Sequence, residues 1–164
     1  MKLRLPIRKS LDGLLSRYRL PGGRLEQHSH DALELDFVVR GTATILVDRV
    51  QVPLAPRSLL WLFPGQEHLV VKHSDDFEMW IGCFRPRLLK RSCTTEETHA
   101  LRSTRVREIH CRQLSPPAAR RLYQLLAEVS AYEESSTYNA GLAHLLLHAW
   151  MQYQQADEPD LKIL

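Results

Sequence analysis

The feature that most constrains the fold is a series of short apolar segments separated by turn residues. Between residues 33 and 84 these segments are rich in β-branched and aromatic residues and are about four to eight residues long. Clusters of Pro, Gly and Asp lie between them, and no helical segment alternates with them. The pattern predicts a single all-β barrel or sandwich and argues against a parallel sheet with crossover helices.

From about residue 115 the spacing of apolar residues changes from two to near four. Ser115 is the expected N-cap of a first helix, and the two prolines after it fit a first helical turn. A second helix over residues 137–155 is apolar on most sides, which predicts packing on two surfaces, the first helix and a partner subunit. We divide the chain into a barrel over 1–112 and a helical segment of the same domain over 113–164.

Composition narrows the class of protein. The chain has 164 residues, 44% of them hydrophobic and 25% charged, as in an ordinary globular domain. It has no apolar run long enough to span a bilayer and no signal-peptide core, so we expect a cytoplasmic protein without a membrane partner. Three cysteines without CxxC spacing fit reduced thiols. The formal net charge of +3 is mild, and without a recognition helix the arginine-rich stretches favour a solvated face over nucleic-acid contact.

Three histidines and a carboxylate carry the chemistry that the sequence suggests. His28, His30 and Glu34 share one face of an extended segment, and His68 follows a Pro-Gly turn further along the chain. Three neutral imidazoles and a carboxylate suit zinc, nickel, iron or manganese, and they suit calcium or magnesium poorly. The alternative is that these side chains are hydrogen-bonding residues that line an empty or organic-ligand pocket.

The same residues resemble the cupin family. His28, His30, Glu34 and Gly41 match the first cupin signature without a spacing error, and Gly22 stands at the glycine that opens it. The resemblance implies a double-stranded β-helix, or jelly-roll barrel, with a divalent metal bound inside. The second signature is met only in part. Its core is matched by Pro64, Gly65 and His68, and the departures from it are Arg57, Phe63 and Lys72.

Residues 56–68 followed by 77–89 look most like the sensor domain of AraC-type transcription regulators, and this resemblance covers about residues 14–155. It implies a cupin-like barrel that binds a small-molecule effector, with a metal ion as a candidate part of the site. It also implies a homodimer formed through the C-terminal helices, centred on residues 142–151. DNA would be contacted only through helix-turn-helix units that are absent from this chain, which ends at Leu164.

Three further residues are candidate ligand contacts. Trp61 and Trp80 are expected either to line the pocket or to belong to the core. Asp36 faces inward if the strand continues regularly from Glu34, and a buried carboxylate there needs an arginine, a metal or a cationic effector group. A bulge after Glu34 would instead turn Asp36 towards solvent, and the sequence leaves both outcomes open.

The alternative function is a stand-alone metal-dependent cupin enzyme of the dioxygenase, isomerase or decarboxylase type. Glu67 and Asp36 are the only candidates for a general base beside the ligands, and neither lies in a recognisable motif. The helical tail is also longer than a small cupin enzyme requires. The sequence therefore favours a sensor without catalytic residues over an enzyme.

Overall fold

The protein, described here by a computed structural model of residues 1–19 and 26–157, is built mainly from antiparallel strands. Gly22, which the cupin resemblance includes, lies outside the described residues. The predicted β-class fold is confirmed. The strands are β1 (Gly13–Arg19), β2 (Leu33–Arg40), β3 (Ala43–Val47), β4 (Val50–Leu54), β5 (Ser58–Leu62), β6 (His68–His73), β7 (Glu78–Phe84) and β8 (His110–Gln113).

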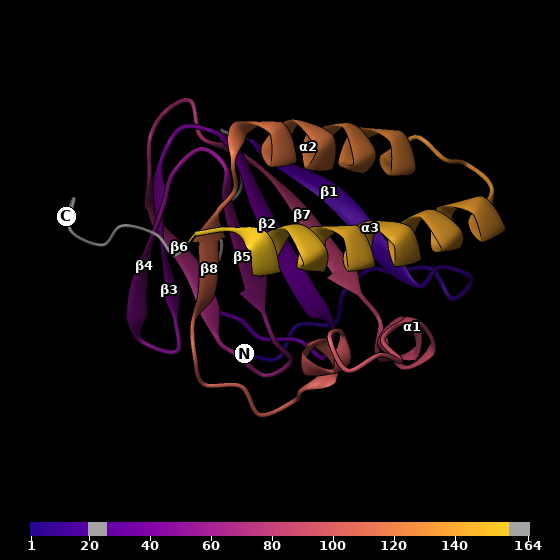
Figure 1. Ribbon diagram of the computed structural model, residues 1–164. Helices are drawn as coiled ribbons and strands as arrows, with labels where there is room; N and C mark the ends of the chain where they lie inside the picture. The colour runs from indigo at the N-terminus through magenta and orange to yellow at the C-terminus, as the bar shows by residue number, and fades with distance from the viewer. Residues whose placement is uncertain (20–25, 158–164) are drawn as a thin grey trace.

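These strands form two sheets that pack face to face (Figure 1). One sheet has five strands in the order β1-β7-β2-β5-β8, and the other has three in the order β4-β3-β6. The proline-containing β4 lies at an edge, where the missing N–H donor of Pro53 is tolerated. The apolar interior between the sheets takes side chains from both layers, including Ile45 and Val47 from the smaller sheet and Leu60 and Leu62 from the larger one.

Strand β2 shows how the larger sheet divides its side chains between two cores. Leu33, Leu35 and Phe37 belong to the core on the outer face, under the helices. Glu34 and Asp36 alternate with these residues and therefore face the other sheet. The register of β2 against β7 shifts only between Val38 and Arg40, so no bulge turns Asp36 outward.

Helices cover the outer face of the five-stranded sheet (Figure 1). After β7 come α1 (Pro86–Ser92) and the 3-10 helix η1 (His99–Arg102), and α2 (Pro116–Ser130) and α3 (Ser135–Gln155) follow β8. The predicted N-cap is confirmed, because the Ala118 N–H donates to the Ser115 side chain at 3.3 Å. The sequence interpretation missed α1 and β8. No helix of the described residues has the length and apolar character that a bilayer span needs.

Helix α3 is buried on two sides by its own chain. It packs against α2 and, through residues such as Leu142 and Trp150, against the sheet. The apolar surface from which we predicted a subunit contact is thus accounted for largely within one chain, although Met151 remains 45% exposed. The homodimer stays a prediction, but the apolar surface of α3 is no longer an argument for it.

A candidate metal centre between the two sheets

The loop that precedes β2 and the start of β6 are joined by backbone hydrogen bonds. The His28 N–H donates to the His68 carbonyl at 3.2 Å, and the His68 N–H donates to the His28 carbonyl at 2.9 Å. The Gly65 N–H also donates to the His30 carbonyl at 3.1 Å. Gly65 has a φ of 85°, a left-handed conformation that glycine adopts without steric cost. These bonds bring two segments, distant in sequence, to one end of the sandwich.

The three predicted imidazoles and the predicted carboxylate converge there. The nearest ring nitrogens of His28, His30 and His68 all lie within 4.8 Å of one another. Oε2 of Glu34 lies 2.5 Å from Nε2 of His30 and 3.5 Å from Nε2 of His68. His30, Glu34 and His68 are buried, and His28 is half-buried. The imidazoles form one ligand group, and Glu34 adjoins it at His30 and His68, so these four side chains are the candidate ligands of one ion.

The backbone orients each ring towards the centre. Nδ1 of His28 lies 2.8 Å from the Glu26 carbonyl, and Nδ1 of His30 lies 3.0 Å from the Ala32 carbonyl. Nδ1 of His68 lies 3.0 Å from a carbonyl as well, that of Gln66. Because a carbonyl oxygen only accepts, each Nδ1 carries a proton and donates it. This is the arrangement that leaves Nε2 as the metal ligand and fixes the ring plane.

Glu34 and the neighbouring His68 imidazole shift each other's pKa. Burial raises the pKa of Glu34, but the hydrogen bonds and positive charge offered by His30 and His68 outweigh it and hold that pKa well below its usual range. Burial lowers the pKa of His68, and the Glu34 carboxylate reverses this effect and raises it. Nε2 of His68 is buried, and its contact with Oε2 of Glu34 is long, at 3.5 Å, so this nitrogen is only weakly satisfied. A metal ion fits this site because it would satisfy that nitrogen and neutralise Glu34.

The sequence interpretation missed a fifth side chain, Cys83. A ligand atom from each of His30, Glu34 and Cys83 lies within 4.8 Å of the others, and Sγ of Cys83 is 3.9 Å from Oε2 of Glu34. Cys83 lies opposite Glu34 in the β2–β7 register, a pairing that no local spacing reveals. Burial and the negative charge of Glu34 raise the pKa of this thiol.

Asp36 lies deeper between the sheets, two residues beyond Glu34 on the same face of β2. It is 1% exposed, and neither carboxylate oxygen has a hydrogen-bond partner within residues 1–19 and 26–157. Burial and then the charge of Glu34 raise the pKa of Asp36 well above its usual range. Both effects favour the neutral form of this acid over the charged form.

Trp61 and Trp80 do not share this interior. Both belong to the core on the outer face, where Trp61 makes edge-to-face contacts with Trp150 at 5.6 Å and with Tyr153 at 6.4 Å between ring centroids. The Arg17 guanidinium lies 5.2 Å from the Trp80 ring centroid. The structure thus separates the two tryptophans from Asp36, with which we had grouped them as ligand contacts.

The protein is thus a two-layer antiparallel sandwich with helices on one outer face and a buried imidazole cluster between the layers. The family model described as the AraC-like ligand binding domain matches residues 11–160, and the chain belongs to this family. No curated protein matches the chain in sequence.

Two solved regulators, ToxT and CuxR, share this fold. Apo ToxT K231A from Vibrio cholerae is similar with a TM-score of 0.54 and 10% identity, over 87% of this chain and 57% of that chain. The AraC-like transcriptional activator CuxR is similar with a TM-score of 0.50 and 11% identity, over 80% of this chain and 46% of that chain. A cupin 2 conserved barrel domain protein from Salinispora arenicola matches 54% of this chain and 78% of that chain, at 23% identity and a TM-score of 0.40. The chain spans about half the length of the two regulators.

Proposed function

We propose that this domain is the effector-sensing part of an AraC-type transcription regulator and that its imidazole centre binds a divalent transition metal that takes part in effector binding. The observation that carries the proposal is the convergence of His28, His30 and His68 on Glu34 between the sheets. Membership in a ligand-binding family favours this function over the enzyme alternative.

The donor set defines what each residue would do. His28, His30, His68 and Glu34 would hold the ion, which would supply a Lewis-acid position for an oxygen or nitrogen atom of the effector. The backbone carbonyls at Nδ1 hold the rings in place before the ion arrives, and this preorganisation lowers the entropic cost of binding. Glu34 would exchange its contact with His30 for the ion.

The regulator as a whole requires more than this domain. ToxT, a structural neighbour, has been solved with an unsaturated fatty acid bound, which supports a small organic effector for this fold. We propose that DNA is read by helix-turn-helix units outside this chain, that the regulator works as a homodimer, and that it acts in the cytoplasm. Sensing requires that the effector bind one arrangement of the domain better than another.

A metal titration tests the central part of the proposal. Chelator-treated protein titrated calorimetrically with zinc or nickel is expected to bind one equivalent, and the His30→Ala, Glu34→Ala double variant is expected to lose this binding. A His99→Ala variant is the matched control, because His99 is exposed in η1 and outside the cluster. Equal sub-stoichiometric binding by the wild type and the double variant would reject the metal site.

A further inference from the structure

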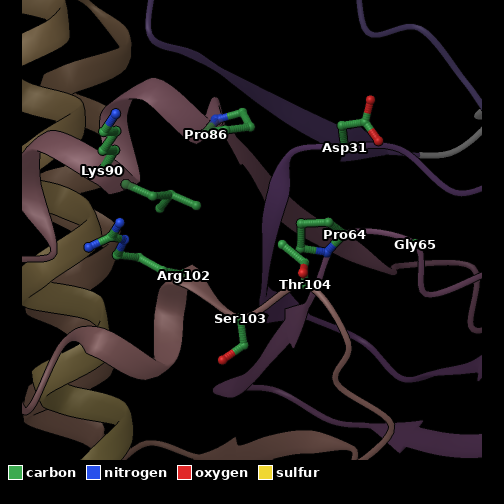
Figure 2. Close-up of a pocket in the computed structure, with 9 residues that line it drawn as sticks. Asp31, Pro64, Gly65, Pro86, Lys90, Arg102, Ser103 and Thr104 are labelled. Carbon is green, nitrogen blue, oxygen red and sulfur yellow. The ribbon is translucent and has the colours of Figure 1, made fainter.

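A cavity of about 510 Å³ lies on the helical side of the molecule (Figure 2). Its volume is that of a small-molecule site. It lies where α1 and η1 meet the loops that carry His30 and the turn before His68. It is lined by Asp31, Pro64, Gly65, Pro86, Leu89, Lys90, Arg102, Ser103 and Thr104.

The positive charges on this cavity differ from the other basic groups around α1. The Arg85 side chain donates to backbone carbonyls, including that of Ile7, and both Arg87 and Arg91 pair with the Asp12 carboxylate. Lys90 has no hydrogen bond or ion pair to another side chain in the described part of the chain. The three arginines that hold α1 in place are thus hydrogen-bonded or ion-paired. Lys90, which borders the cavity, is available to bind a ligand.

Arg102 brings a second available cation to the same wall. Figure 2 shows the Arg102 and Lys90 side chains on the same side of the pocket, and α1 and η1 pack against each other. Across residues 1–19 and 26–157, Arg102 forms no hydrogen bond or ion pair with an acidic side chain. The acidic residue on the facing side, Asp31, is engaged by Lys2 at 2.9 Å. The lining therefore includes two cationic side chains without an acidic partner among the described residues, and one acidic side chain, Asp31, that is paired with Lys2.

The rest of the wall is apolar. Pro64, Pro86 and the largely buried Leu89 supply a hydrophobic surface next to the two cations. An anion without an apolar body would leave this surface in water, and an uncharged apolar molecule would leave the cations unpaired. We propose that this cavity binds a small organic anion, a carboxylate on a short apolar body, with Lys90 and Arg102 as the groups that pair with its charge.

The cavity is connected to the imidazole centre through the backbone. Asp31 follows His30 directly, and the Gly65 N–H that donates to the His30 carbonyl lies in the cavity wall. A ligand here therefore touches both loops whose positions set the distance between His30 and His68. The binding of an anion to Lys90 and Arg102 does not depend on the proposed function. Only its role as effector or co-effector rests on that function.

Binding is tested with benzoate as the probe, by NMR titration of the uniformly ¹⁵N-labelled domain. We expect saturable shifts at residues 102–104, and a dissociation constant raised about tenfold or more in Lys90→Met and in Arg102→Met. Lys72→Met, which removes an exposed cation on β6 outside the cavity, is the matched control and is expected to bind as the wild type does. Benzamide, which has the same shape without the charge, is expected to bind at least about tenfold more weakly.

Each other outcome overturns the inference. Absence of binding, equal binding of benzoate and benzamide, or an unchanged constant in both cation variants would show that the cavity does not select an organic anion. Inorganic phosphate binding as tightly as benzoate would show that the apolar wall contributes nothing. The titration is done on metal-free protein and repeated on zinc-loaded protein. Benzoate binding by the metal-free protein tests the cavity alone, so it can succeed or fail whether or not the imidazole centre binds zinc.

Discussion

The two faces of the five-stranded sheet differ in chemistry although the same strands build both. On the outer face β2 and β5 present Leu35 and Trp61 to the helices, in a core made of apolar side chains. On the inner face β2 presents Glu34 and Asp36, and β7 presents Cys83, to the space between the sheets. The two carboxylates of β2 and the Cys83 thiol of β7 thus lie on the same side of this layer.

This difference separates stability from binding. The outer face gains free energy from burying apolar area, and the inner face gives some of it up because carboxylates lose their hydration there. A buried carboxyl group without a partner is expected to cost stability unless a ligand satisfies it. The four predictions below test this separation, beginning with the largest expected effect.

The first prediction concerns the outer face alone. Trp61→Ala is expected to lower the free energy of unfolding by about 3–5 kcal/mol, because a side chain that is 1% exposed leaves a cavity under α3. Urea denaturation followed by circular dichroism measures the loss. Met151→Ala, at an exposed position of α3, is the control and should change stability by no more than about 0.5 kcal/mol. A loss below about 1 kcal/mol for Trp61→Ala would contradict the assignment of this face.

The second prediction concerns the effect of zinc, bound at the inner face, on the free energy of unfolding. Zinc at about one hundred times its dissociation constant is expected to raise the free energy of unfolding by about 2.7 kcal/mol, because the ion binds the folded protein only. The same addition should leave His68→Ala unchanged, since this variant lacks the ligand from β6. Chemical denaturation with and without zinc gives the increment. An equal increment in His68→Ala would mean that zinc binds elsewhere.

The third prediction removes an unpaired acid. Asp36→Val is expected to raise the free energy of unfolding by about 1–3 kcal/mol, because a buried carboxyl group without a partner is replaced by an apolar β-branched side chain of similar size. Urea denaturation at pH 7 measures the gain, and Asp36→Asn, which keeps a buried polar group, should gain less. A destabilised Asp36→Val would show that Asp36 has a partner in the ligand-free domain.

The fourth prediction uses a buried acid that is paired. Burial raises the pKa of Asp12, but hydrogen bonds from Arg91 and Arg87 outweigh it and place the pKa below the ordinary value of 3.8. A depressed pKa contributes stability above the unfolded value, which is lost as the pH falls through the folded value. Asp12→Asn should therefore be less stable than the wild type by about 1 kcal/mol at pH 7, and the difference should shrink below pH 3.8. A difference that does not change with pH would contradict the pairing.

Much of the site could be predicted because its determinants are local. The period of two in an extended chain places His30 and Glu34 on one side, and the cupin-like spacing adds His68 after its Pro-Gly turn. The convergence of these residues with His28 was expected and is observed in the geometry, whereas the metal itself stays a prediction. Local alternation also predicted most strands, and Ser115 marked the start of α2.

The inward direction of Asp36 could not be decided locally. It depends on where β2 shifts against β7, and that shift falls beyond Val38. Cys83 joined the cluster for the same reason, since its pairing with Glu34 is a matter of register. Trp61 and Trp80 look like pocket residues in the sequence, and only the position of α3 shows that their face of the sheet is covered by helices.

The sequence by itself determined the β class, the family, and which side chains share a face within each strand, because these follow from spacing along one extended segment. Only the tertiary structure decided which strand faces meet, that α1 is held by Arg87 and Arg91 on Asp12, and that Lys90 is left available beside a cavity. Such pairings join residues far apart in the chain. They are fixed by packing and long-range hydrogen bonds, which leave no periodic signal in the sequence.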